Sequence, residues 1–330
     1  METIKAIQID SFGAPKKMEL RNVPLLFPGP EEVRIRVGYV GMNPIDAMAR
    51  SGKIDFLPIK FPFTPGLEHT GIVESVGSQV DKKLLHRRVL SRSDFGAYSE
   101  YSIIPARNLL FLDDRISLKL GCAYRGASFT AWHALHKSAR IIPDDVCLFH
   151  SAAGAIGIMG AQIAKSHGCM VIGLVGGSKK VDFALNYSFD HVFDYSEPGW
   201  QEKVNSVSGV GVNVIIDGNS GKNSDSNLDL LAPLGRLVYI GATAGEMPKP
   251  IEVPALIYKS ISVAGINLSD IEEPTGSHVD KTITDNVTSG LWRVPITEEV
   301  GLEGVVDLHY RLENRLLSGR AVIKVGGELT

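Results

Sequence analysis

The sequence has few cysteines, little charge imbalance and no long apolar run. The three cysteines, Cys122, Cys147 and Cys169, form no CxxC pair, which argues against a disulfide scaffold or a structural zinc lobe. The 34 basic and 37 acidic residues give a net charge of −3, which argues against nucleic-acid-coating and disordered chains. No apolar run reaches the roughly 18 residues of a membrane span, and no signal peptide is visible. We therefore expect a cytoplasmic, soluble protein without membrane or nucleic-acid partners.

The length predicts two domains, because 330 residues exceed the roughly 250 to 300 at which one core stops growing. From Met1 to about Gly121, short alternating runs broken by glycine and proline predict a β-rich, barrel-like region with few helices. These runs are IKAIQI (4–9), EVRIRVGYV (32–40), TGIVESVG (70–77), RRVLS (87–91) and YSEYSII (98–104).

Between about Ala123 and Ile266, apolar strands alternate with helical stretches, which predicts a parallel sheet covered on both faces and a doubly wound nucleotide-binding domain. The expected strands are 146–150, 170–175, 191–194, 212–217, 236–241 and 261–266. A polar stretch (267–281), a helix near 308–317 and a strand AVIKV (321–325) follow, and we expect the last strand to rejoin the first domain. The expected domains are 1–122 with 268–330, and 123–267.

The sharpest motif lies in VCLFHSAAGAIGIMGAQIAKSHG, residues 146–168. An apolar strand leads into a turn of small residues, and a helix follows. Such a turn lets the backbone approach a pyrophosphate, while the helix N-terminus supplies N–H donors and a positive dipole end. A small-residue helix that merely packs on the sheet is the structural alternative. The predicted cofactor-binding residues are Ala152, Ala153, Gly154, Ala155, Ile156 and Gly157.

The end of the next strand predicts which dinucleotide binds. An NAD site places a carboxylate there for the ribose 2′-hydroxyl. This chain instead has Gly177, Ser178, Lys179 and Lys180. A hydroxyl and two cations suit a 2′-phosphate, so the sequence predicts NADP(H); the alternative is that the lysines only solvate a helix start. We expect Gly177→Asp to shift the preference toward NADH.

Three longer stretches carry a family resemblance. They are GMNPIDAMARSG (41–52), FTPGLEHTGIVESVG (63–77) and DDVCLFHSAAGAIGIMGAQIAK (144–165). The chain resembles the medium-chain dehydrogenase/reductase superfamily and, within it, the zinc-independent quinone oxidoreductases related to zeta-crystallin. The resemblance implies an α/β protein with a GroES-like β-barrel domain for the substrate, a Rossmann domain for NADP(H), and a cleft between them.

The resemblance also bears on metal binding. Zinc-dependent members of the superfamily have a cysteine at the position of Asn43 and a histidine at that of Leu67, and neither residue present here is a zinc ligand. We therefore expect no metal. Without a Lewis acid, the feasible reaction is hydride transfer from NADPH to an electron-poor acceptor, namely a quinone or an α,β-unsaturated carbonyl.

Further site residues follow from the resemblance, each with a plainer alternative. Asn43 would contact the substrate, or it only shapes its own turn. Thr130 would lie near the nicotinamide amide, or it only caps a helix start. Tyr195 would contact the 2′-phosphate, or it is a surface aromatic, and Arg320 would be a cofactor contact or a surface charge. The residues expected to border the nicotinamide or the cleft are Gly241, Ala242, Asn267 and Leu268.

Other features point to structural roles and to assembly. Glu68 is expected to be structural, and the three cysteines inert. The apolar strand near 260–266 would be an aggregation hazard if it were a bare sheet edge, and the family pairs this edge, so we expect a homodimer.

Two other functions remain open. One is an enoyl or alkenal double-bond reductase of a biosynthetic pathway, which would differ in the segments 54–61 and 267–273. The other is a non-catalytic NADPH-binding protein.

Overall fold

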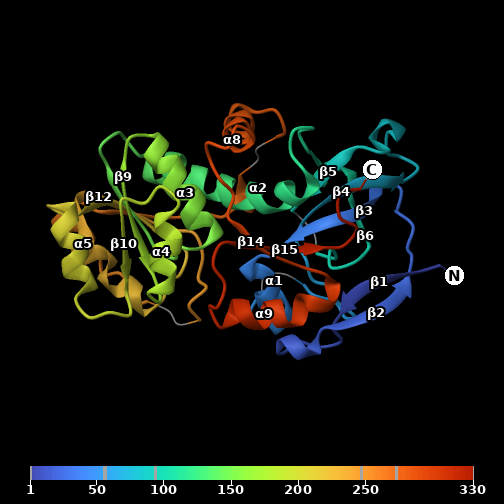
Figure 1. Cartoon of the computed structure of the whole chain (residues 1–330), viewed down its shortest axis with the longest axis horizontal. Helices are drawn as coiled ribbons and strands as arrows, with labels where there is room; N and C mark the ends of the chain where they lie inside the picture. The colour runs from blue at the N-terminus through green and yellow to red at the C-terminus, as the bar shows by residue number, and fades with distance from the viewer. Residues whose placement is uncertain (1, 55–57, 93–94, 246–247, 272–273, 330) are drawn as a thin grey trace. The chain divides into compact units, whose positions relative to one another are not determined.

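The computed structural model describes residues 2–54, 58–92, 95–245, 248–271 and 274–329 (Figure 1). The chain divides into two compact units. Unit 1 comprises Met1–Gly126, Glu273–Thr288 and Ile296–Thr330, and unit 2 comprises Ala127–Glu272 and Ser289–Pro295. These boundaries differ from the expected ones by a few residues at 126 and 272, and Ser289–Pro295 was expected in the first domain. It packs in unit 2 because Arg293 N donates to Gln162 Oε1 at 2.7 Å and Trp292 Nε1 donates to Ser166 Oγ at 2.9 Å.

Unit 1 is rich in strands, as its alternating runs predict, and its described strand pairs are antiparallel except for β14 with β15, which is parallel. Its larger sheet has the order β14-β15-β3-β4-β5-β7, with β6 also paired to β3. The last strand, β15, lies antiparallel to β3, so the C-terminal segment rejoins the first domain as expected. The strands of this unit are β1 (Thr3–Gln8), β2 (Glu19–Pro24), β3 (Glu32–Gly41), β4 (Glu68–Val76), β5 (Arg88–Ser91), β6 (Tyr101–Pro105), β7 (Leu110–Phe111), β14 (Ile296–Val300) and β15 (Arg320–Lys324).

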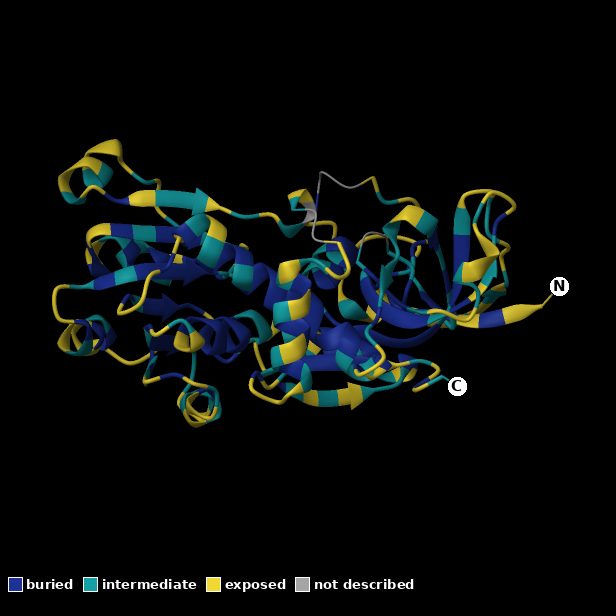
Figure 2. Cartoon of the chain, turned by 90° about the horizontal axis from the view of Figure 1, so that it is seen from above, coloured by how far each residue is buried: buried dark blue, intermediate teal, exposed yellow. Residues whose placement is uncertain are grey.

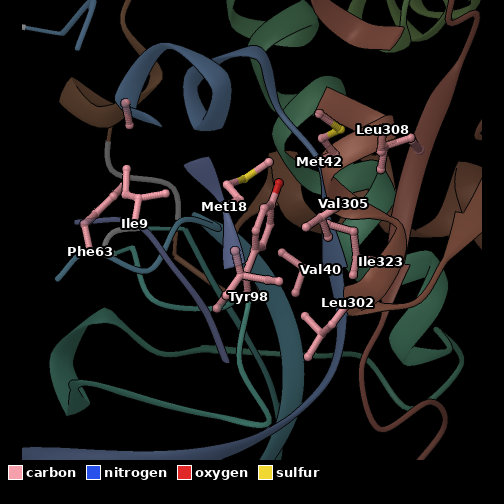
Figure 3. Packing of buried hydrophobic residues seen from close by; sticks show 14 of the residues in the cluster. Ile9, Met18, Val40, Met42, Phe63, Tyr98, Leu302, Val305, Leu308 and Ile323 are labelled. Atoms are coloured by element: carbon pink, nitrogen blue, oxygen red, sulfur yellow. The ribbon is translucent and has the colours of Figure 1, made fainter. Parts of the chain in front are cut away.

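The helices of unit 1 were the part that the sequence predicted least well. α1 (Pro44–Ser51) was missed because two turns are too short to show a period; Asn43 caps its N-terminus and Gly52, whose φ is +79°, caps its C-terminus. α8 (His278–Thr288) lies largely beyond the stretch described only as polar, and α9 (Val305–Glu313) begins earlier than expected. Figure 3 shows the hydrophobic core of unit 1 to which α9 contributes Val305 and Leu308. Its labelled residues are Ile9, Met18, Val40, Met42, Phe63, Tyr98, Leu302, Val305, Leu308 and Ile323.

Unit 2 contains a parallel sheet of order β10-β9-β8-β11-β12-β13. In chain order this is 3-2-1-4-5-6, the arrangement of the doubly wound nucleotide-binding fold, in which β8 and β11 flank the point where the order reverses. All six expected strands are present. They are β8 (Val146–Phe149), β9 (Met170–Val175), β10 (His191–Asp194), β11 (Val212–Asp217), β12 (Leu231–Tyr239) and β13 (Ser262–Gly265). Figure 2 colours the chain by burial; β8, β9 and β11 are largely buried, whereas β13 is half-buried or exposed at each residue.

The helices of unit 2 connect these strands, as a parallel sheet requires. α2 (Leu118–His133) begins in unit 1 and continues into unit 2, and a π-helical turn, Ala134–Ala139, follows it. Among the described helices, none is both long and apolar enough to cross a membrane. The remaining helices are α3 (Ala155–Ser166), α4 (Lys179–Leu185), α5 (Trp200–Ser208), α6 (Asn227–Leu230) and α7 (Val253–Lys259).

Candidate functional site

The turn after β8 has the geometry that its small residues predict. Ala152 is buried, and its N–H donates to Leu174 O on β9 at 3.0 Å. Gly154 N donates to Ser151 O at 2.8 Å, and α3 begins directly afterwards. A Cβ on Gly157 would lie 2.7 Å from Ser151 O, so only glycine lets the helix start this close to the turn. The first turn of α3 therefore presents its N–H groups where a pyrophosphate would bind.

A second loop follows the neighbouring strand β9. Gly177 has a φ of +104°, and its N–H donates to Asp194 Oδ1 at 2.9 Å. That oxygen also accepts from the N–H and the hydroxyl of Ser196, so Asp194 fixes the loop. Ser178 and Lys179 are exposed at the start of α4. The loop thus carries the Ser178 hydroxyl and the Lys179 ammonium group at its surface, while the Asp194 carboxylate holds the loop backbone.

Tyr195 lies with this loop rather than on the open surface. Its N–H donates to Val175 O at 2.9 Å, and the side chain is half-buried. A Cβ on Gly176 would lie 2.5 Å from the Tyr195 hydroxyl. Tyr195 therefore lies beside the glycine that precedes Gly177, and its contact with a 2′-phosphate stays a prediction.

A buried carboxylate lies at the end of β11, beside the reversal of the strand order. Asp217 has no exposed surface and accepts from Asn219 N, Ser220 N and Asn227 Nδ2 at 2.8 to 2.9 Å. Burial raises its pKa, but His150 and the hydrogen bonds from Ser224, Ser220 and Asn219 outweigh burial, so the net shift is downward. This network was not predicted from the sequence, although the aspartate that ends an apolar strand before Gly-Asn-Ser is a visible signal.

The remaining predicted cofactor residues lie in loops that follow β12 and β13. Gly241 is exposed, and its carbonyl accepts from Ser220 Oγ at 2.6 Å, which joins the loops after β11 and β12. Ala242 is exposed next to it. Asn267 is exposed after β13, and Leu268 begins a short 3₁₀ turn. Every predicted cofactor residue except Arg320 therefore follows the carboxyl end of a strand of one sheet, the edge where ligands bind in such folds.

In unit 1, Arg320 and Glu68 form a buried ion pair that also holds Asn43. Arg320 Nη1 donates to Asn43 Oδ1 at 2.7 Å, and its Nη2 donates to Glu68. Asn43 Nδ2 donates to Gly41 O at 3.0 Å and to Glu68 Oε2 at 3.2 Å. Arg320 is only 5% exposed, so the surface-charge alternative is wrong. Asn43 therefore shapes its turn, and both of its amide protons are engaged.

The same ion pair binds the backbone of α2. Glu68 Oε1 accepts from Gly126 N at 2.7 Å, and Arg320 Nη2 donates to Cys122 O at 3.2 Å. These two backbone groups are four residues apart, the spacing of one helical turn. Glu68 thus has the structural role expected of it. Thr130 lies in the last turn of this helix, so the alternative that it caps a helix start is wrong.

Asp46 is a second buried carboxylate beside Asn43. It is fully buried, and it accepts from Asn43 N at 2.8 Å and from Leu67 N at 3.1 Å. Burial raises its pKa to about 7, against the opposing effects of these N–H groups and of Arg320. Asp46 therefore gains or loses a proton near neutral pH, a property that its residue type alone did not reveal.

The donor set around Asn43 does not fit zinc. Leu67 offers only its backbone, Asn43 is a poor ligand, and the guanidinium of Arg320 already provides a cation between Asn43 and Glu68. His69 is hydrogen-bonded to Ser102 at 2.7 Å. Within the residues that the structure describes, no three His, Cys, Asp or Glu side chains are grouped so that they could hold a metal ion.

Known protein families match residues in both units of the chain. The model of the alcohol dehydrogenase GroES-like domain matches residues 29–114, and that of zinc-binding dehydrogenases matches residues 155–280. A quinone oxidoreductase of Sus scrofa is 33% identical over 270 residues, which cover 80% of each chain. The solved Escherichia coli quinone oxidoreductase complexed with NADPH has a TM-score of 0.88 at 26% identity, covering 97% of this chain and 99% of that one. The Pseudomonas syringae pv. Tomato DC3000 quinone oxidoreductase has a TM-score of 0.88 at 27% identity.

The identity to the porcine protein extends over most of both chains, and the fold match includes both units. The match covers the GroES-like unit and the parallel nucleotide-binding sheet in the same order along the chain. This chain belongs to the quinone oxidoreductase family of the medium-chain dehydrogenase/reductase superfamily, a family of oxidoreductases.

Proposed function

We propose that this protein transfers a hydride from NADPH to a quinone or an α,β-unsaturated carbonyl without a metal ion. The observation that carries the cofactor assignment is the loop after β9. Its surface presents Ser178 and Lys179, while Asp194 is buried and its Oδ1 already accepts from Gly177 and Ser196. The NADPH complex of the Escherichia coli relative supports the same cofactor.

The residues of unit 2 would bind and orient the cofactor. When bound, NADPH supplies the hydride from its nicotinamide ring. The N–H groups of Ala155, Ile156 and Gly157 at the start of α3 would hold the pyrophosphate, and Lys179 with Lys180 the 2′-phosphate. The loops at Gly241 and Asn267 would border the nicotinamide. Thr130 remains a predicted contact of the nicotinamide amide.

Unit 1 would supply the substrate contacts. A substrate oxyanion needs a hydrogen-bond donor or a cation nearby. Because both amide protons of Asn43 are engaged, its direct contact with the substrate requires one of these hydrogen bonds to be given up. A quinone oxyanion can take its proton from water, so the reaction needs no dedicated acid. The segments that would distinguish enones from quinones, 54–61 and 267–273, lie partly outside the described residues, at 55–57 and 272–273.

An acceptor panel tests the reaction. NADPH oxidation is followed with 1,4-naphthoquinone, 9,10-phenanthrenequinone and 2-alkenals, alongside a binding titration of NADPH. We expect turnover with quinones that persists after treatment with a chelator. Turnover with alkenals alone would establish the double-bond reductase instead, and binding without any turnover would establish a non-catalytic protein. Loss of activity on chelation would contradict the metal-free reaction.

The cofactor preference is tested at Ser178 rather than at Gly177. With a φ of +104°, Gly177 accepts an aspartate only with strain, whereas Ser178 has a helical φ of −56°. We expect Ser178→Asp to lower kcat/KM for NADPH and to raise it for NADH, because a carboxylate repels a 2′-phosphate and accepts from a 2′-hydroxyl.

Lys179→Ala should raise KM for NADPH by roughly tenfold, since one charge-assisted contact is worth about 1.5 kcal/mol, and should leave NADH unaffected. The control is Lys203→Ala, which removes a half-exposed lysine of α5 that is paired with Glu197. An unchanged ratio of NADPH to NADH activity in both test variants would contradict the assignment.

A further inference from the structure

Two of the three cysteines lie side by side at the base of the parallel sheet in unit 2. Cys147 is the second residue of β8, and Cys169 directly precedes β9. In the pairing of these strands, Cys147 lies opposite Val171, two residues after Cys169. Residues two positions apart on a strand point to the same face. The two cysteines therefore project from the same face on neighbouring chain segments.

The backbone fixes this arrangement independently of the thiols. Asp144 N donates to Gly168 O at 3.2 Å, and Met170 N donates to Asp145 O at 3.0 Å. These bonds lie on either side of Cys169 and hold the beginning of β9 against the beginning of β8. The proximity of the two cysteines is thus a property of the sheet.

The two thiols are in direct contact and are not equivalent. Cys147 is hydrogen-bonded to Cys169, whose Sγ donates to Ile142 O at 3.5 Å. This contact with Cys169, together with burial, raises the pKa of the Cys147 thiol, whereas the contact with Cys147 lowers that of Cys169. The carboxylate of Asp145 raises the pKa of both thiols, and the guanidinium of Arg236 opposes this effect. Cys169 is accordingly the better nucleophile, and Cys147 lies where a resolving thiol must be.

We propose that Cys147 and Cys169 are a reversible dithiol–disulfide site that a hydroperoxide oxidises. The Cys169 thiolate attacks an oxygen of hydrogen peroxide, the O–O bond breaks, and a sulfenic acid forms with release of water. The Cys147 thiol attacks this sulfur, displaces a second water molecule and forms the S–S bond. Two thiols lose two electrons and two protons, and one peroxide becomes two waters. A small dithiol reverses the step by exchange.

This site is separate from the predicted cofactor loops. Cys147 lies near the amino end of β8, whereas the phosphate turn follows its carboxyl end. The oxidation requires neither NADPH nor the predicted substrate. Both side chains are at most 2% exposed, so peroxide reaches them through local opening of the sheet base, and the reaction is slower than that of an exposed thiol.

The test counts thiols in the full-length protein after exposure to hydrogen peroxide. The protein is alkylated in denaturant, and its peptides are analysed by mass spectrometry. We expect the three thiols to fall to one, a peptide pair linked through Cys147 and Cys169, and full recovery with dithiothreitol. Three outcomes would overturn the proposal: the number of free thiols stays at three, the disulfide includes Cys122, or a cysteine is oxidised irreversibly to a sulfinic acid.

Cys122 provides the matched control. It lies in unit 1 with its Sγ 3.2 Å from Lys119 O, and burial raises its pKa well above the usual range. Cys122→Ser should still form the link, whereas Cys147→Ser and Cys169→Ser should not. The wild-type peptide map decides the question even where a serine variant fails to fold. The thiol count does not use reductase activity, so its failure is distinguishable from failure of the proposed function.

Discussion

At the residue scale, His309 is an imidazole enclosed in the core of unit 1. Its side chain has no exposed surface, and its Nε2 lies 3.1 Å from the Tyr98 hydroxyl. Burial and the nearby Arg50 lower its pKa to about 3. The folded protein therefore keeps this histidine neutral at pH values where the unfolded chain protonates it.

We expect this histidine to make the protein less stable as the pH falls. The unfolded side chain titrates at about 6.5, so between about 6.5 and 3 the folded state binds fewer protons. The free energy of unfolding should drop by about 2 kcal/mol from pH 7 to pH 5 on account of this group. Urea unfolding at both pH values would measure the drop, and His309→Gln should remove it. The same pH dependence in both proteins would contradict the prediction.

Arg320 permits a second prediction at this scale. Its removal leaves the fully buried Glu68 without its closest cation, so Arg320→Met should lower the free energy of unfolding by about 3 to 5 kcal/mol. Adding Glu68→Gln should recover part of the loss, because the unpaired charge is then absent. Denaturant unfolding compares the three proteins. Arg21→Met, which removes a surface ion pair with Asp10, is the control and should change stability little.

At the element scale, the start of α3 depends on how closely the helix approaches the turn. We expect Gly157→Ala to weaken NADPH binding by roughly tenfold or more, because its Cβ would meet Ser151 O at 2.7 Å and push the helix away. Ala155→Gly, in the same helical turn, is the control and should bind NADPH normally. A calorimetric titration measures both. Normal binding by Gly157→Ala would show that the helix start does not hold the pyrophosphate.

At the scale of the whole molecule, assembly remains a proposal. β13 is the last strand in the sheet order of unit 2, and the preceding helix α7 exposes Val253, Ile257 and Tyr258. We propose that a second copy covers this edge in a homodimer. Ile257→Glu with Tyr258→Glu should yield monomers in size exclusion with light scattering, whereas Val210→Glu, at another exposed apolar residue, should leave the dimer intact. A monomeric wild type would refute the proposal.

The parts that the sequence predicted well are those with a regular local signal. The six strands of unit 2 are near-continuous apolar runs, and the phosphate turn is marked by residues whose small size is itself the requirement. The parts it missed depend on partners distant in the chain. Nothing local shows that Arg320 meets Asn43, that Asp194 holds Gly177, or that burial raises the pKa of Asp46 to about 7. Such contacts arise only when the strands are assembled.

The hydrogen bonds that join Arg320 and Glu68 to the backbone of α2 affect which positions can change among relatives of this protein. The helix contributes the backbone carbonyl of Cys122 and the backbone N–H of Gly126. Because these groups do not depend on the side chain, a substitution at Cys122 keeps the hydrogen bond from Arg320 to the carbonyl of residue 122. Glycine is required at Gly41 and Gly126, where a Cβ would lie 1.9 Å from Cys122 O and 2.8 Å from Glu68 Oε2. The side chains at 43, 68 and 320 should therefore covary in an alignment, with a loss of charge at one position accompanied by a change at another.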